Sequence, residues 1–277
     1  MNAINCKGKL LDLTTPVVMG IINATPDSFY KGHLSPGGEA IVTLAGNMIS
    51  DGAAILDIGG LSTRPGSEAV SVQKETDRVV PVIEAINRAY PDIILSIDTY
   101  NSAVAKAAVA AGATMVNDIS GGNLDPDMID TVAALAVPYI CMHMQGTPAT
   151  MQQHPVYQDL VAEVLDFFVQ KIEICTRAGI KDIIIDPGFG FGKTIQHNFE
   201  LLKALQLFAA TKRPVLAGLS RKSTVYKTLS VTAADALNGT TVVNTMALLN
   251  GASVLRVHDV KEAKEAILLF NAYTKAP

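Results

Sequence analysis

The chain has 277 residues, of which 49% are hydrophobic and 17% charged, and its formal net charge is -4. This length fits one globular domain over residues 1–277 with a large apolar core, and the modest negative charge argues against a nucleic-acid partner. Its three cysteines, Cys6, Cys141 and Cys175, form no C-x-x-C pair and indicate neither a disulfide framework nor a zinc site. Residues 1–16 lack a signal-peptide core and no later apolar run could span a bilayer, so we expect a soluble cytoplasmic protein without a membrane partner.

The predicted elements begin with a small hairpin over Ile4 to Pro16, which turns near Gly8. Short β-branched or aliphatic runs then recur along the chain, as expected of buried strands. The predicted strands are Val17 to Asn23, Ala54 to Gly59, Ile93 to Asp98, Met115 to Ile119, Pro138 to His143, Ile183 to Asp186, Val215 to Leu219 and Ser253 to His258.

Segments with helical periodicity separate these strands. The clearest are Ser71 to Arg88, Asn101 to Ala111 and Leu160 to Arg177. Glycines just after helical stretches predict left-handed residues that stop each helix. They are Gly52, Gly112, Gly179 and Gly251.

Eight strands that alternate with helices predict a (β/α)₈ TIM barrel, with the hairpin capping its bottom. A doubly wound open sheet is the competing fold, but eight comparable units without a second domain favour closure. Each strand run ends on a polar residue, and the carboxyl ends of barrel strands meet on one face, so we expect one pocket there. The polar residues are Asn23, Asp57, Asp98, Asn117, His143, Asp186, Ser220 and His258.

The first strand leads into the sequence M-G-I-I-N-A-T-P-D-S-F. The amide of Asn23 suits a magnesium ion or a phosphate oxygen, although Asn is also an ordinary turn residue. Asp27 and Phe29 fall in the loop that follows, whose glycines predict movement.

The second strand leads into D-I-G-G-L-S-T-R-P-G. Here Thr63 supplies a hydroxyl, Arg64 a forked donor for phosphate, and Pro65 stiffens the loop. A salt-bridged surface arginine is the plainer interpretation of Arg64.

Asp98, Asn117 and Asp186 are expected in the barrel mouth. Ionised Asp accepts hydrogen bonds and Asn both donates and accepts, so the set suits a flat heterocycle rich in N–H groups. A lone Asp at a strand end is often a helix N-cap, but three such residues weaken that account. His143 lies between two methionines and is interpreted as a hydrogen-bonded wall residue rather than a catalytic base.

The segment D-P-G-F-G-F-G-K invites comparison with a phosphate-binding P-loop. Pro187 stands where that motif requires glycine and has no N–H to offer, so a nucleoside triphosphatase is rejected. Phe189 and Phe191 instead predict aromatic cover for an organic ligand.

The loops after strands seven and eight form the usual phosphate corner of a barrel. Arg256 and His258 are two residues apart on one strand face, so two cationic side chains are expected to clamp one anion. Ser220 opens the seventh loop, and of Arg221 and Lys222 only one is expected to face the pocket.

Together these motifs, with A-G-A-T-M-V-N-D-I-S-G, M-H-M-Q-G-T-P, S-R-K-S and R-V-H-D-V, resemble the dihydropteroate synthase family along essentially the whole chain. The resemblance implies a transferase that joins 6-hydroxymethyl-7,8-dihydropterin diphosphate to p-aminobenzoate, with magnesium as cofactor. It further implies dissociative substitution through a pterin carbocation, with no enzyme nucleophile, and a homodimer. Its interface could come from the late helices at Val242 to Leu249 and Ala263 to Phe270.

Residue roles carry over position by position from the resemblance. Asp98, Asn117, Asp186, Lys222 and Met142 are implied to bind the pterin, and Asn23 to meet magnesium. The diphosphate is implied to contact Asn23, Thr63, Arg64, Arg256 and His258. The p-aminobenzoate site is implied to include Thr63, Ser220, Lys222, Phe29, Pro65 and Phe191, with Asp27 and Asp57 supporting the movable loops.

The chain departs from the family pattern in both loops. Leu61 stands where the family commonly has Glu, and Lys31 with His33 replaces an acidic and glycine-rich continuation. A pterin-dependent methyltransferase and a non-catalytic pterin-binding protein are the alternatives, but both leave Arg64, Arg256 and His258 without a task. Sulfonamides, as analogues of p-aminobenzoate, should compete in principle.

Overall fold

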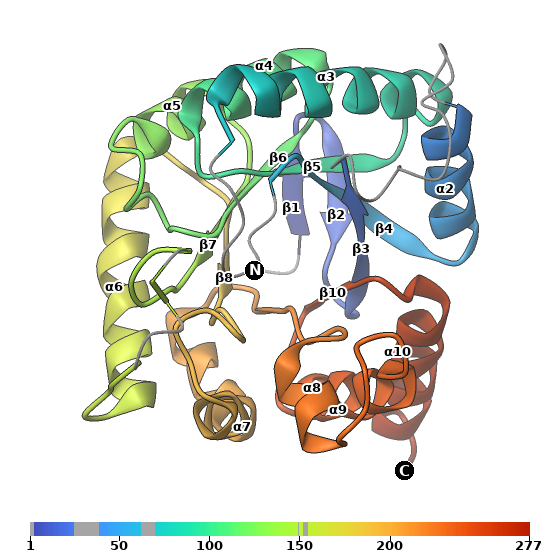
Figure 1. Cartoon of the computed structure of the whole chain (residues 1–277), viewed down its shortest axis with the longest axis vertical. Helices are drawn as coiled ribbons and strands as arrows, with labels where there is room; N and C mark the ends of the chain where they lie inside the picture. The colour runs from blue at the N-terminus through green and yellow to red at the C-terminus, as the bar shows by residue number, and fades with distance from the viewer. Residues whose placement is uncertain (1–2, 25–38, 62–69, 149, 152–154) are drawn as a thin grey trace.

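The structure, a computed structural model, describes residues 3–24, 39–61, 70–148, 150–151 and 155–277. Its centre is an eight-stranded parallel sheet surrounded by helices (Figure 1). The strands are β3 (Val17–Asn23), β4 (Ala53–Gly59), β5 (Ile94–Asp98), β6 (Met115–Asp118), β7 (Tyr139–Met142), β8 (Ile183–Asp186), β9 (Leu216–Ala217) and β10 (Val254–Val257).

The sheet closes on itself. Its strand order is β8-β7-β6-β5-β4-β3-β10-β9, and a parallel bridge between Ile185 and Val215 joins the two ends. This closure confirms the predicted TIM barrel and excludes the open doubly wound sheet. The seventh strand is shorter than the predicted Val215 to Leu219, because the chain leaves the ladder after Ala217.

Strand periodicity explains how the barrel interior changes from apolar to polar. Alternate residues of a strand share a face, so residues two apart point into the barrel at successive heights. The inward-facing residue at the lower height is apolar on every strand. On four of the strands, the inward-facing residue at the next height is Asp57, Asn117, Asp186 or Arg256. The lower layer consists of Met19, Ile55, Ile94, Met115, Ile140, Ile184, Leu216 and Val254.

The N-terminal hairpin closes the bottom of the barrel. It consists of β1 (Ala3–Cys6) and β2 (Lys9–Asp12), whose Ile4, Cys6 and Leu11 pack against the lower apolar layer. The Nζ of Lys9 also donates to the carbonyl of Ile93 over 2.8 Å, just before β5. The predicted cap is therefore confirmed.

The helices surround the strands and bury their apolar stripes against them (Figure 1). Predicted ends hold to within a residue or two: Ser71 caps its helix by accepting from the amide of Lys74, and Gly52, Gly112, Gly179 and Gly251 all have positive φ. The helices are α2 (Glu39–Ser50), α3 (Val72–Ala89), α4 (Ser102–Ala111), α5 (Met128–Leu135), α6 (Leu160–Ala178), α7 (Ile195–Ala204), α8 (Ser223–Thr228), α9 (Leu237–Leu249) and α10 (Val260–Thr274), with a 3₁₀ turn η1 (Leu205–Thr211).

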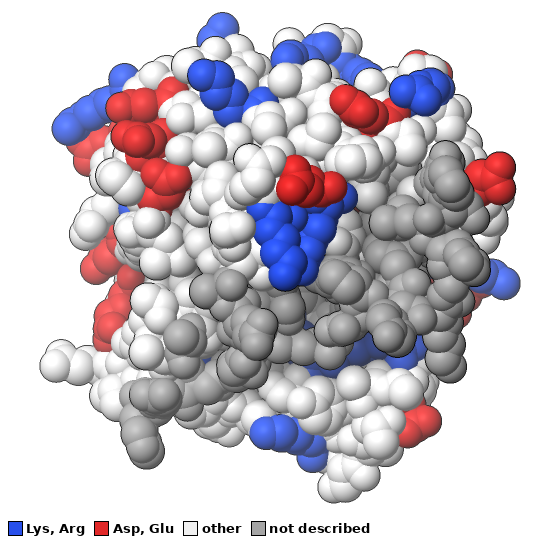
Figure 2. All heavy atoms as spheres, turned by 45° about the horizontal axis from the view of Figure 1, so that its top comes forward, with Lys and Arg blue, Asp and Glu red and all other residues white. Residues whose placement is uncertain are grey.

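The surface carries both signs of charge in small groups. Figure 2 shows Lys and Arg interspersed with Asp and Glu on one face, most of which is uncharged. None of the helices in the described residues has the length and apolarity needed to cross a membrane.

Candidate active site

The carboxyl ends of β4, β5 and β6 bring predicted site residues together. The parallel register pairs Gly59 with Asp98 and Asp98 with Asn117, so these two polar side chains lie on adjacent strands. Asp57, one step deeper on β4, is fully buried. Its Oδ2 accepts from the Nδ2 of Asn117 over 2.9 Å, across the barrel.

Arg256 reaches these groups from β10. Its Nε donates to Oδ2 of Asp57 and its Nη2 to Oδ2 of Asp98, each over 2.6 Å. Burial alone would lower the pKa of Arg256, but the two carboxylates outweigh it and the net shift is upward. The inward cation is therefore stabilised by carboxylates.

Asp98 has an unusual carboxyl group. Burial, opposed by Arg256 and reinforced by Asp57, raises its pKa to about 7. Deeper in the barrel, Oδ1 of Asp57 and Oγ of Ser96 are buried and have no hydrogen-bond partner among the described residues. Buried polar atoms are normally paired, so these two oxygens are left for a bound water or a polar ligand group.

Asp186 and Lys222 form the opposite wall. Burial raises the pKa of Asp186, against the charge of Lys222, while its Oδ1 accepts from the amide of Gly188 over 2.8 Å. Burial lowers the pKa of Lys222 to about 8. Met142 on β7 lies beside them, since a Cβ at Gly188 would be 3.3 Å from its Cγ.

Lys222 also contacts the turn that follows β8. Its Nζ donates to the carbonyl of Phe189 over 2.5 Å and lies 4.7 Å from the ring centroid of Phe191. Arg221, whose φ is +52°, points away instead and forms a bidentate ion pair with Asp259. As predicted, only one of the two neighbouring cations faces the mouth.

Ser220 and His258 meet at the rim. The hydroxyl of Ser220 lies 3.0 Å from Nδ1 of His258 and accepts from its backbone amide over 3.2 Å. Desolvation, together with the charge of Arg256, lowers the pKa of His258 to about 4. Arg256 is thus charged in this structure, whereas the lowered pKa makes His258 neutral near pH 7; the expected clamp of both side chains on one anion stays a prediction.

His143 lies outside the ring of mouth residues. It packs edge-on against Phe167 with ring centroids 5.0 Å apart, and its Nδ1 lies 2.9 Å from Nζ of Lys193. This is the hydrogen-bonded wall position predicted for it. Lys193 is 2% exposed, and sequence reasoning assigned it no role because the P-loop comparison had been rejected.

The chain matches the pterin-binding enzyme family over residues 19–258. Dihydropteroate synthase from Escherichia coli strain K12 is 42% identical over 272 residues, which are 98% of this chain and 96% of that protein. The chain belongs to the dihydropteroate synthase family.

Solved dihydropteroate synthase structures agree with this assignment. The Yersinia pestis enzyme in complex with a sulfonamide drug has a TM-score of 0.93 and 42% identity, covering 99% of this chain and 100% of that one. The Xanthomonas albilineans enzyme with 4-aminobenzoic acid also has a TM-score of 0.93, with 41% identity, covering 100% and 99%. Its structure with 7,8-dihydropteroate has a TM-score of 0.89 and 40% identity, covering 99% and 100%.

Some predicted site residues of this dihydropteroate synthase family member lie outside the described residues. They are Asp27, Phe29, Thr63, Arg64 and Pro65. Asp57 lies within β4, inside the predicted strand, where Arg256 and Asn117 contact it, and its expected support of a movable loop stays a prediction.

Asn23 is the last residue of β3, and its side chain is exposed at the mouth. Among the described residues, no group of three or more His, Cys, Asp or Glu could hold a metal ion. Magnesium sites commonly use one or two protein oxygens, completed by substrate phosphates and water. A single Asn23 oxygen fits that kind of site.

Proposed function

We propose that the chain joins 6-hydroxymethyl-7,8-dihydropterin diphosphate to p-aminobenzoate, forming 7,8-dihydropteroate and releasing pyrophosphate. The observation that carries this proposal is one barrel mouth that combines buried acceptors with two cations. Asp98, Asn117 and Asp186 are the acceptors, and Lys222 and Arg256 are the cations. The likeness to enzymes solved with 4-aminobenzoic acid and with 7,8-dihydropteroate supports the same substrates here.

The pterin would lie against the deep wall of the mouth. Its ring edge presents several N–H donors, which match the carboxylates of Asp98 and Asp186 and the amide of Asn117. Lys222 would donate to a ring acceptor, and buried Met142 would pack on the ring face. The unpartnered oxygens of Asp57 and Ser96 support a polar ligand or water at this depth.

The diphosphate would lie at the rim near Arg256. The guanidinium is charged and held in place. The neutral imidazole of His258 can donate a hydrogen bond from Nε2 while its Nδ1 faces Ser220. Thr63 and Arg64 would complete the contacts from the second loop. Asn23 would hold magnesium together with the diphosphate, and the ion would neutralise charge on the leaving group.

The p-aminobenzoate would lie above the pterin, between Ser220, Lys222 and Phe191. The half-buried Phe191 ring beside the Lys222 ammonium supports an aromatic carboxylate site, since one offers a face and the other a charge. Thr63, Phe29 and Pro65 would close it from the two loops.

The reaction would then be a dissociative substitution. The bond between the pterin methylene carbon and the diphosphate oxygen breaks, and pyrophosphate leaves with the bonding electrons. The carbocation is delocalised over the pterin, the amine nitrogen donates its lone pair to form the C–N bond, and the nitrogen loses a proton. The chain's contribution is to bind, orient and exclude water, so no nucleophilic side chain is required.

The test uses purified protein with magnesium and the pterin diphosphate, with and without p-aminobenzoate. We expect pyrophosphate release and dihydropteroate formation that depend on both substrates. Tight pterin binding without product would instead favour a pterin-binding or methyl-transfer protein. A magnesium-dependent gain in diphosphate affinity would separate the synthase from both alternatives.

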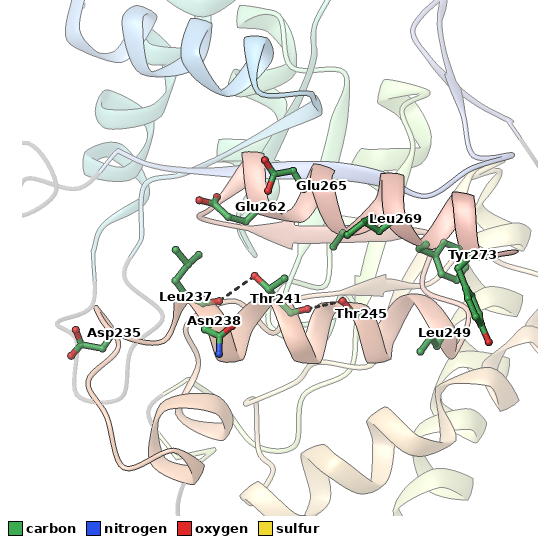
Figure 3. A pocket seen from close by; sticks show the side chains of 12 residues that line it. Asp235, Leu237, Asn238, Thr241, Thr245, Leu249, Glu262, Glu265, Leu269 and Tyr273 are labelled. Carbon is green, nitrogen blue, oxygen red and sulfur yellow. Dashed lines mark hydrogen bonds between the residues drawn. The ribbon is translucent and has the colours of Figure 1, made fainter. Parts of the chain in front are cut away.

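We also propose that two copies pair through the groove between α9 and α10. The groove has a volume of about 800 Å³. Its lining combines apolar side chains, which include Leu249, Leu269 and Tyr273, with polar and acidic ones, among them Glu262 and Glu265 (Figure 3). Thr241 and Thr245 direct their hydroxyls to carbonyls of their own helix, which leaves their methyl groups for a partner. The exposed fraction of Leu269 is 73%, and a second copy that covers this side chain would remove its apolar surface from water.

A further inference from the structure

Lys193 is a buried cation that the proposed reaction does not use. Its Nζ lies 2.9 Å from Nδ1 of His143 and 3.0, 3.1 and 3.3 Å from the carbonyl oxygens of Phe191, Gly188 and His143, so its three N–H groups face four acceptors. None of the ion pairs between described residues includes Lys193. Burial lowers the pKa of Lys193 to about 7, against the charge of the Asp186 carboxylate, so its position calls for a physical reason.

Two of the three carbonyls around Lys193, those of Gly188 and Phe191, belong to the turn after β8, and the third is that of His143 after β7. The amide of Phe191 donates to the carbonyl of Gly188 over 3.0 Å, and the Lys193 ammonium binds both of these residues' carbonyls. The turn contains Gly188, Gly190 and Gly192, all with positive φ. Glycines lose much conformational freedom when they become ordered. A central lysine that donates to the carbonyls of Gly188 and Phe191 offsets part of that entropy loss.

The same turn faces the active site on its other side. Lys222 donates to the carbonyl of Phe189, and the Phe191 ring lies beside the Lys222 ammonium. Two ammonium groups therefore hold the turn between them: Lys193 from the wall and Lys222 from the mouth. If the contacts of Lys193 with the turn are removed, the Phe191 ring should lose its fixed position beside the Lys222 ammonium.

His143 completes the wall side. To accept from Lys193, its Nδ1 must carry no proton, and burial together with the Lys193 charge lowers the pKa of His143 to about 3. Tyr157 adds a further link, because its hydroxyl donates to the carbonyl of Gly192 over 2.8 Å. The wall side of the turn is thus fixed by a buried network that touches no substrate position.

From this geometry we propose that Lys193 is a positioning residue that fixes Phe191 as one wall of the p-aminobenzoate site. This inference rests on the proposed function. Lys193 binds the turn through the carbonyls of Gly188 and Phe191, whereas the pterin residues Asp186 and Lys222 keep their own contacts with it, through the amide of Gly188 and the carbonyl of Phe189. Asp98 and Asn117 lie on other strands, so we expect a larger effect on the second substrate than on the pterin. Since bond breaking precedes amine attack, saturating p-aminobenzoate should restore the rate.

The first variant is Lys193→Met, which keeps an unbranched buried chain and removes the ammonium. We expect the KM for p-aminobenzoate to rise about tenfold, the size of one lost charged hydrogen bond, with kcat and the KM for pterin diphosphate within about twofold of wild type. An unchanged KM for p-aminobenzoate, or an equal effect on both substrates, overturns the proposal. A wild-type protein that makes no dihydropteroate would instead refute the proposed function itself.

A matched pair at His143 tests the same network while keeping Lys193, in case Lys193→Met does not fold. His143→Asn retains an acceptor oxygen near the position of Nδ1, whereas His143→Leu removes it. We expect the Asn variant to stay within about twofold of wild type and the Leu variant to raise the KM for p-aminobenzoate about tenfold. Equal KM values for the two variants would overturn the role of the Lys193 network.

Discussion

The Nε of Arg256 donates to Oδ2 of Asp57 over 2.6 Å, deep in the barrel. The same oxygen accepts from Asn117, and Asp98 holds the other side of the guanidinium. The cation is thus charged and fixed before a ligand binds. Fixed donors need little reorganisation when a leaving group develops charge, so this arrangement supports pyrophosphate departure.

Replacing Arg256 with Ala should weaken the binding of inorganic pyrophosphate about thirtyfold, or about 2 kcal/mol. The change removes the charged donor and leaves Asp57 and Asp98 to repel the anion. Isothermal titration calorimetry with magnesium present gives the affinity. Arg177→Ala is the control, because Arg177 is 76% exposed on α6 and pairs only with Glu173 among described residues. Equal pyrophosphate affinity in the Arg256→Ala variant would remove Arg256 from the diphosphate site.

The affinity for 6-hydroxymethylpterin should depend on pH through Asp98, whose pKa burial raises to about 7. Protonated Asp98 loses acceptor capacity, so affinity should rise as pH increases through about 7 and then level off. The unphosphorylated ligand avoids titration of the diphosphate, and measurements should stay below the pKa of Lys222, about 8.

Asp98→Asn is the matched control, since an amide does not titrate, and the affinity of this variant should be low and independent of pH.

The raised pKa of Asp98 also makes the free energy of unfolding depend on pH, with the opposite sign. Folded Asp98 binds a proton more tightly than the unfolded residue, whose pKa is near 3.8, so its contribution to stability is present below about 4 and declines as pH rises towards 7. A wild-type affinity that does not change near pH 7 would contradict the assignment.

Local sequence signals predicted the barrel and the position of most mouth residues. Asp98, Asn117 and Asp186 could be placed because each ends an apolar run, and parallel strands end on one face. The contact of Arg256 with Asp57 could not, because it joins residues 199 positions apart and depends on barrel register. The neutral state of His258 likewise depends on neighbours that only the fold supplies.

Two further features needed the structure. The proposed role of Lys193 was missed because the glycine spacing was tested only as a P-loop, and its contacts with the carbonyls of Gly188 and Phe191 depend on the path of the turn. The short β9 was also not apparent, because Gly218 and Leu219 continue the apolar run although the strand ends at Ala217 and the chain turns towards Arg221, whose φ is positive.

Gly188→Ala should destabilise the protein far more than Gly179→Ala. Both glycines have positive φ, which costs an Ala side chain about 1 kcal/mol. A Cβ at Gly188 would lie 1.9 Å from the carbonyl oxygen of His143, whereas a Cβ at Gly179 meets nothing within 4 Å. Urea unfolding should therefore give a loss of about 3 kcal/mol or more for Gly188→Ala and about 1 kcal/mol for Gly179→Ala. Similar losses would mean that the turn after β8 can shift away from β7.

Leu249→Lys should separate the proposed dimer into monomers. Leu249 lines the groove between α9 and α10 and is 56% exposed, so an ammonium there would lose its hydration in the paired state and replace an apolar contact. Sedimentation should give twice the chain mass of 29.3 kDa for wild type and 29.3 kDa for the variant. Leu207→Lys is the control, because Leu207 is similarly exposed, at 53%, but lies on η1 outside the groove. A monomeric wild type would refute pairing, whereas a Leu249→Lys variant that stays as dimeric as wild type would move the interface to another face.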